Sequence, residues 1–436
     1  MKKWTFIFLS SVVLIFVQCK KNEDTLPAFK IIRPFENSQW AVYDTIGFEI
    51  HNQSNVFIKQ VKVCVLNSSF VPVTSEGLFE LTDNSWDFKG THVIKNSLIQ
   101  NGTHYFRVIM TDKNDNSSTR YAQITISEIP LRSEALYIVA KQSNSIYNIY
   151  RCDSFPQYEK VLTLHTDFSG SAISSQSGVL YVCGKYTGPL AAYDVANGHQ
   201  LLWQEDALLN PPSPWFEGVE FDGRYLVAGY TDHRVKGFLP GGSLQFVFEM
   251  HDYFPKVFLR HYDQQQQKEY LIVGASHFSG LHQLISVHYD MSYSNMQFLK
   301  TNWEVHSMFS KNFDEILMFG NESGQGVMKN YKISANNTYV LHLLPTGKLY
   351  DVVRISSGVF LISHDQGVSL YRSSTNSLTP YGVFPGKGVF SYDEVTGKCF
   401  YAVGGSLTAF DFMSTTVDGN INFADSIVQM HILFNK

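Results

Sequence analysis

Short apolar runs separated by polar turns repeat through the later part of the chain. Each run is followed by one centred on an aromatic residue, and two further runs fill the space before the next repeat. Seven leading runs recur every 40 to 46 residues: LYIVA (136–140), LYVCG (180–184), YLVAG (225–229), YLIVG (270–274), ILMFG (316–320), VFLIS (359–363) and CFYAV (399–403). Four short strands per repeat are typical of a β-propeller blade, whose sheet is covered on both faces by its neighbours. The pattern predicts a seven-bladed β-propeller over residues 131–436.

The first repeat begins at what corresponds to the second strand of a blade, so the first blade lacks its innermost strand. The C-terminal run IVQMHILF (427–434) has no place in the seven repeats and can supply that strand. The ends of the propeller would then share one blade, which leaves no unpaired inner edge. The alternative is that this run is the outer strand of the seventh blade.

Residues 28–128 show a different pattern, in which apolar and polar positions alternate in short runs such as FKIIRP, IGFEIHN and HYFRVIMTD. Alternation of this kind predicts strands that are buried on one face only. The size and spacing resemble an immunoglobulin-like or fibronectin-type β-sandwich of about 100 residues. We therefore expect an all-β chain in which an Ig-like β-sandwich precedes the propeller.

Residues 1–18 have the pattern of a secretory leader. Lys2 and Lys3 precede an apolar run of 14 residues (4–17), which is short for a permanent membrane span and is followed by Cys19 and a polar stretch. The arrangement resembles the lipoprotein signal of Bacteroidetes, which implies a lipid on Cys19, a tether over 19–27 and an outer-membrane protein facing the cell surface. An uncleaved membrane anchor is the alternative.

Charge and cysteine content exclude several classes of function. The formal charge is −5, and −7 once Lys2 and Lys3 leave with the leader, and no basic stripe suits nucleic acid. Cys64, Cys152, Cys183 and Cys399 lie in apolar runs without the spacing of a zinc site, so we expect buried free thiols, with a Cys152–Cys183 disulfide as the alternative. Neither a metal nor a cofactor is predicted, and no motif of a known catalytic class occurs.

Two segments of the propeller region resemble known repeat families. AAYDVANGHQLLW (191–203) resembles the repeat of pyrroloquinoline-quinone proteins, and YDEVTGKCFYAV (392–403) resembles YVTN-type repeats. The resemblance implies a YVTN-like or quinoprotein-like propeller lipoprotein rather than a true quinoprotein dehydrogenase.

The segments that enter each blade, and the turns between the second and third strands, meet around one mouth of a propeller's central channel, where ligands usually bind. Aromatic side chains stand beside charged ones there, which suits an amphipathic ligand. The entering segments also carry Phe168, Lys256, Asp351 and Lys387. The alternative for each aromatic residue is that it packs between blades. The predicted ligand-binding residues are Trp215, Glu217, His277, Trp303, Glu304, His306, Tyr350 and His364.

These features favour a surface-anchored lipoprotein that captures a small molecule or glycan, or docks onto an outer-membrane transporter. Two alternatives stay open. A glycan lyase or hydrolase could use residues at the mouth, of which Glu304 and His306 are the first to test, because a propeller brings residues of different blades together. An interaction scaffold for another envelope protein needs only the rigid ring and its spacer.

Overall fold

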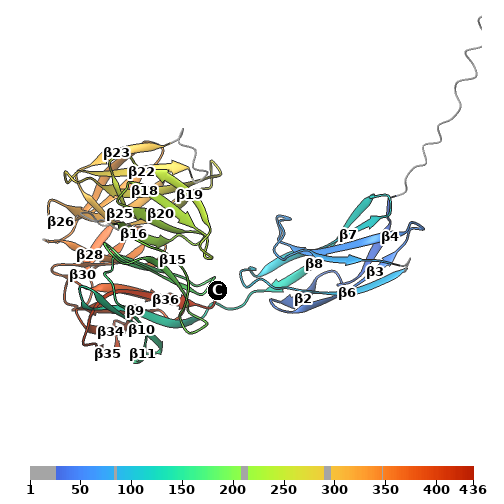
Figure 1. Ribbon diagram of the computed structural model, residues 1–436, viewed down its shortest axis with the longest axis horizontal. Coiled ribbons are helices and arrows are strands. Elements are labelled where there is room, and N and C mark those ends of the chain that lie inside the picture. Colours follow the sequence, from blue (N-terminus) through green and yellow to red (C-terminus); the bar gives the residue numbers. More distant parts are fainter. Residues whose placement is uncertain (1–25, 83–85, 208–214, 289–295, 346) are drawn as a thin grey trace, which may run out of the picture. The chain divides into compact units, whose positions relative to one another are not determined.

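The computed structural model describes residues 26–82, 86–207, 215–288, 296–345 and 347–436, and these form strands and no helix. They divide into two compact units, Met1–Pro130 and Leu131–Lys436 (Figure 1). None of the described residues lies in a helix that is long and apolar enough to cross a membrane. The predicted leader and Cys19 fall outside the described residues.

The first unit contains two sheets that share one apolar core. Ile46, Phe48 and Ile50 alternate with exposed positions and face this core, where the ring of Phe48 lies 5.6 Å from that of Phe106. The three-stranded sheet has the order β1-β3-β6 and the five-stranded sheet the order β2-β8-β7-β4-β5. The strands are β1 (Phe29–Arg33), β2 (Ser38–Ala41), β3 (Thr45–Asn52), β4 (Ile58–Leu66), β5 (Gly77–Glu80), β6 (Asp87–Val93), β7 (Gly102–Asp112) and β8 (Ser117–Ser127).

The second unit contains seven four-stranded antiparallel sheets within its described residues. The first sheet is β36 (Ser426–Phe434), β9 (Ser133–Ser143), β10 (Ile146–Ser154) and β11 (Gln157–Leu164), from the inner to the outer strand. The second and third are β12 (Gly170–Ser174), β13 (Val179–Cys183), β14 (Leu190–Asp194), β15 (Gln200–Glu205), and β16 (Phe216–Phe221), β17 (Leu226–Tyr230), β18 (Arg234–Phe238), β19 (Leu244–Glu249).

The remaining four sheets follow the same plan of consecutive antiparallel strands. They are β20 (Phe254–Asp263), β21 (Lys268–Ser276), β22 (His282–His288), β23 (Gln297–Thr301); β24 (Glu304–Ser310), β25 (Glu315–Glu322), β26 (Gln325–Lys332), β27 (Asn337–Leu343); β28 (Leu349–Ser356), β29 (Val359–His364), β30 (Gly367–Arg372), β31 (Ser377–Pro380); and β32 (Val389–Asp393), β33 (Lys398–Val403), β34 (Ser406–Asp411), β35 (Val417–Asn422).

The inner strands of these sheets form a closed ring. Each contacts the inner strand of the next sheet in the order β36, β12, β16, β20, β24, β28 and β32, and β32 contacts β36 again. Sheets arranged radially in this way are the blades of a β-propeller. The predicted all-β propeller is confirmed, and the repeats read from the sequence correspond to its blades.

The second strands of the blades are largely buried on both faces and the third strands mostly so, as their apolar sequences predict. Every residue of β13 and of β17 is buried. Cys64, Cys152, Cys183 and Cys399 are buried free thiols, so the alternative of a Cys152–Cys183 disulfide is not realised. Desolvation raises the pKa of Cys152 to about 11, which keeps this thiol protonated at neutral pH.

The C-terminal strand closes the ring. Strand β36 pairs antiparallel with β9 from Ser426 to Phe434, and Figure 1 shows the red strand beside the green one. The first of the two alternatives for the run 427–434 is therefore confirmed. A side chain of β36 also fastens the neighbouring blade: the N–H and hydroxyl of Ser171 each donate to Gln429 Oε1 at 2.9 Å, and Gln429 Nε2 donates to the Ser171 carbonyl at 3.0 Å.

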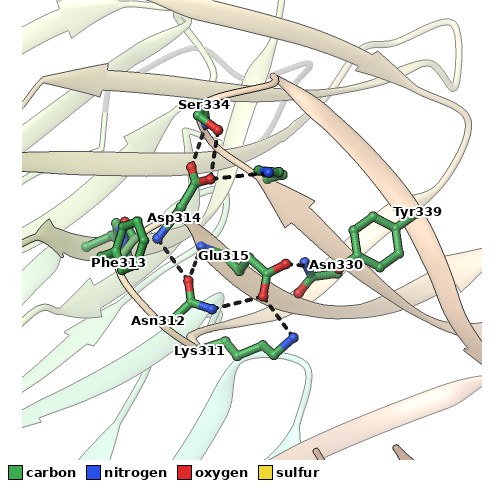
Figure 2. A network of polar contacts seen from close by, with 10 residues as sticks. Lys311, Asn312, Phe313, Asp314, Glu315, Asn330, Ser334 and Tyr339 are labelled. Carbon is green, nitrogen blue, oxygen red and sulfur yellow. Dashed lines mark hydrogen bonds and ion pairs between the residues drawn. The ribbon is translucent and has the colours of Figure 1, made fainter. Parts of the chain in front are cut away.

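The far ends of the inner strands lead into tight turns held by carboxylates and amides. In the turn between β24 and β25, Glu315 accepts hydrogen bonds from Asn312 Nδ2 (2.9 Å) and the Tyr339 hydroxyl (3.0 Å) and pairs with Lys311 (2.9 Å), as Figure 2 shows. Burial alone would raise the pKa of Glu315, but these donors outweigh it and hold the pKa below its ordinary value. This turn, on the side of the ring away from the predicted mouth, is thus held by several polar contacts.

Replacing Gln429 by alanine should weaken ring closure. The change removes three hydrogen bonds and leaves the N–H and carbonyl of Ser171 without these partners, so we expect a loss of about 2–4 kcal/mol in the free energy of unfolding. Chemical unfolding followed by tryptophan fluorescence measures it. Gln266→Ala, at an exposed turn position, is the matched control, and equal effects of both changes would contradict the role given to Gln429.

Candidate functional site

A β-bulge interrupts the inner strand of five of the seven described blades at the same level. In β16, for example, Phe216 is opposite Tyr230 and Gly218 is opposite Gly229, so Glu217 has no partner on β17. A bulge of this kind bends the strand locally and redirects the extra side chain. The bulged residues, called the bulge ring below, are Glu217, Lys256, His306, Tyr350 and Val428.

All five side-chain positions of the bulge ring line a single cavity of about 590 Å³, called the mouth cavity below. They come from five different inner strands, so the cavity lies on the axis of the propeller. Its wall is completed by residues next to the bulges and by Tyr147 and Phe168 from the first blade and the segment before β12. Lys141, Asp351, Phe390, Gln429 and Met430 also line the cavity.

A second cavity of about 390 Å³, the throat cavity, adjoins the first. Val219, Lys256, His306 and Gln429 line both, so the two spaces are consecutive parts of the central channel. The throat cavity adds three polar side chains from inner strands, namely Ser171, Glu220 and His431. The channel therefore carries polar groups at two depths.

Opposite charges alternate on one side of the mouth cavity. The Lys256 ammonium lies 3.5 Å from Glu304 Oε1, and Glu304 is half exposed at the rim. Burial raises the pKa of Glu217, and the positive charges of Lys256 and Lys185 oppose that rise. The positive charge of Lys256 thus offsets part of the negative charge of both Glu304 and Glu217.

Asp351 contributes a carboxylate next to the bulge in β28. Its oxygens accept the N–H of Val352 at 2.8 Å and the N–H of Phe390, on the next inner strand, at 2.6 Å. Burial raises the pKa of Asp351, and the nearby imidazole of His306 opposes that rise. His306 Nδ1 lies 2.9 Å from the hydroxyl of Ser307. This side of the cavity offers both donors and acceptors.

Tyr350 is tied to the rim by its hydroxyl. The hydroxyl donates to Asp365 Oδ1 at 3.0 Å, and the Lys387 ammonium lies 3.5 Å from the same oxygen. The neighbouring His364 is buried, with Nε2 at 2.9 Å from the hydroxyl of Ser369 inside its own blade. Tyr350 therefore belongs to the wall of the mouth cavity, whereas His364 is not among the residues that line it.

The predicted tryptophans take other positions. Trp303 is 1% exposed and packs in the core between two blades, with the Lys329 ammonium 4.8 Å from its ring centroid. Trp215 is half-buried against Tyr230, with the ring centroids 5.5 Å apart. Both positions correspond to the packing alternative for aromatic residues at the blade entrances. His277 contacts Phe278 at the turn between β21 and β22, with ring centroids 3.9 Å apart, and does not line either cavity.

The throat contains two groups that the sequence analysis did not select. Glu220 is reached by water within the channel, yet protein surrounds it, and this desolvation raises its pKa to about 7. Burial lowers the pKa of His431 to about 4, and its Nε2 lies 2.8 Å from the hydroxyl of Ser171. A charged residue within the short apolar strand FEGVEF was the available signal for Glu220.

No group of three or more His, Cys, Asp or Glu side chains could hold a metal ion among the residues described. The mouth cavity is nevertheless within the usual size range of small-molecule sites, and it combines apolar wall with a few convergent polar groups. Its polar groups can form hydrogen bonds with a bound molecule, and its apolar wall can make apolar contacts.

The sequence matches no protein-family model and no curated protein. Similar solved structures include the Dos1 propeller (TM-score 0.44, 10% identity, 68% of this chain and 87% of that one) and Saccharomyces cerevisiae Sqt1 (0.47, 12%, 69% and 90%). Apo AztD from Citrobacter koseri is another (0.43, 9%, 77% and 98%). The assignment of the fold rests on the sheet order and the ring of inner strands described above.

The raised pKa of Glu220 predicts a pH-dependent cost to stability. Below the ordinary pKa of 4.5 this carboxyl is protonated in both the folded and the unfolded chain, and it costs no stability. As pH rises from there through about 7, the free energy of unfolding falls, because the unfolded chain ionises this group more easily than the folded one. Glu220→Gln should therefore be more stable than the parent chain at pH 8, with a smaller difference at pH 5. Unfolding curves at both pH values test this, with Glu249→Gln on the exposed strand β19 as control. A difference independent of pH would contradict the environment assigned to Glu220.

Proposed function

We propose that this protein binds a small ligand in the mouth cavity of its propeller. The observation that carries the proposal is the bulge ring, because five strands make the same irregularity at the same level and all five extra residues meet in one cavity. Bulges are over-represented at sheet edges and next to active sites, where they redirect a side chain. Four of these five side chains, those of Glu217, Lys256, His306 and Tyr350, can form hydrogen bonds.

We further infer that the protein is a lipoprotein of the outer membrane that faces the cell surface. The basis is the leader with Cys19 and the polar residues after it. The two-sheet N-terminal unit is then an Ig-like spacer between the anchor and a YVTN-like or quinoprotein-like propeller. An anchor of several acyl chains holds a protein on a membrane far more firmly than a single one.

An interaction scaffold is the second candidate, and it includes docking onto an outer-membrane transporter. It is favoured by exposed apolar side chains in the turn between β21 and β22, where Phe278 is 83% exposed and Leu281 is 52% exposed. Exposed apolar side chains of this size often mark a contact surface for another protein. Capture of a ligand at the mouth and contact with a transporter through such turns are compatible uses of one face.

A ligand screen tests the proposed site. At least one compound of a library of polar metabolites, peptides and glycans should raise the melting temperature of the purified chain, because a ligand that binds only the folded state stabilises it. The same compound should bind Lys256→Met and His306→Ala at least about tenfold more weakly, as the loss of one charge-assisted hydrogen bond implies.

Lys268→Met, at an exposed position in β21, is the matched control and should bind as the parent chain does. A screen without any stabilising compound, or binding that both cavity variants leave unchanged, would refute the proposal.

The anchor is tested separately by Cys19→Ser. Without the acceptor thiol the chain should move from the membrane fraction to the soluble fraction, whereas Lys20→Ala, which keeps the thiol, should stay in the membrane fraction. Protease added to intact cells should digest the parent chain. Membrane retention of Cys19→Ser would contradict the lipid anchor, and protection of the parent chain would contradict its surface location.

A further inference from the structure

The mouth cavity has two chemically different sides. Glu217, Lys256, His306 and Asp351 form one side, on the consecutive inner strands β16, β20, β24 and β28. The other side, on β32, β36 and the segment before β12, is mainly apolar, with Lys141 as its charged member. Its half-buried apolar residues are Phe168, Val389 and Val428, and the buried residues Tyr147, Phe390 and Met430 lie at its edge.

An aromatic pair gives the apolar side a flat surface. The rings of Tyr147 and Phe168 are stacked, with centroids 5.0 Å apart and planes inclined by 29°. Tyr147 is buried and holds Phe168, which is half-buried, in position. A ring fixed in this way can cover the apolar face of a ligand at little cost in conformational entropy.

Several charged groups of the polar side already have charged or hydrogen-bonding neighbours. Lys256 is shared between Glu304 and Glu217, and Asp351 accepts two backbone N–H groups and faces His306. On the polar side, a ligand with a full charge would therefore have to displace an existing partner, since an unpaired charge in a desolvated site is costly. Hydroxyl groups, which donate and accept, can be added to this network without displacing a charge.

We propose that the mouth cavity takes a neutral carbohydrate, which lays its C–H face on Phe168 and presents its hydroxyls to the polar side. This inference rests on the proposed function and specifies its ligand. A cavity of about 590 Å³ accepts a ligand of drug size, which for a carbohydrate is a short oligosaccharide. The oligosaccharide is bound noncovalently, and no bond in it is broken.

A glycan array probed with the labelled full chain tests the ligand class. The array carries neutral oligosaccharides together with anionic uronic-acid and cationic glucosamine oligomers. Neutral oligosaccharides should give the strongest signals, and calorimetry on the best of them should give an affinity for comparison with variants. Phe168→Ala should lower that affinity by about tenfold, the value of one stacking contact at the upper end of its range, and Glu217→Gln should lower it measurably because the amide accepts fewer hydrogen bonds.

Two controls match these variants: Phe298→Ala on the outer strand β23, where the side chain is 40% exposed, and Glu249→Gln on β19. Both should bind as the parent chain does. Circular dichroism checks whether Phe168→Ala folds. If this variant does not fold, the test rests on Glu217→Gln, which keeps the shape of the side chain.

The outcomes separate this inference from the proposed function. Stronger binding of charged oligomers than of neutral ones would overturn the inference of a neutral carbohydrate. So would an array without any signal, if the metabolite screen yields a ligand that is not a carbohydrate. In both cases the proposed binding site at the mouth would stand. A neutral glycan whose affinity neither cavity variant changes would place carbohydrate elsewhere and overturn the inference. Silence in both array and screen would refute the inference and the proposed function together.

Discussion

The pairing of β36 with β9 is the interaction on which the propeller depends. It completes the first blade with the last strand of the chain, and Gln429 extends the bonding to Ser171 on the next blade. The mouth cavity depends on it too, because the five members of the bulge ring lie on five inner strands whose spacing is fixed only in a closed ring. Stability and ligand site thus share one origin, which is typical of folds in which a rigid scaffold positions a few side chains.

The bulges give this scaffold its chemistry. The extra residue of a bulge leaves the ladder of its own blade, and water in the channel can solvate both its backbone and its charge. The polar residues of the ring are therefore tolerated at the axis although the sheets around them are apolar.

Much of this architecture could be predicted because burial on two faces leaves a clear pattern. The recurring runs every 40 to 46 residues identified the blades, and the surplus run at 427–434 identified the closing strand. The bulges were not predictable, since one extra residue leaves the apolar pattern almost unchanged. The same limitation applies to Trp303 and Trp215: their sequence position at a blade entrance is the same for a side chain that meets a ligand and for one that packs between sheets.

Glu217, His306 and Tyr350 were identified from their position in the entering segments, and the cavity brings them together. Glu220 and His431 were missed because they lie within strands that look wholly structural. The segment 191–203 has a structural role here: Asp194 accepts the N–H groups of Ala196 and Asn197 in a tight turn, and the indole N–H of Trp203 donates to the carbonyl of Pro240 on the next blade.

The position of β36 also governs the order in which the propeller can be built. Until Ser426–Phe434 has been synthesised, β9 lacks its partner on the channel side, and the first blade presents an open edge to any other strand nearby. The earlier blades can form their hairpins in turn, but the ring closes only after residues 426–434 have emerged. A chain that stops before Ser426 would consequently form six complete blades and leave an open, association-prone strand edge on β9.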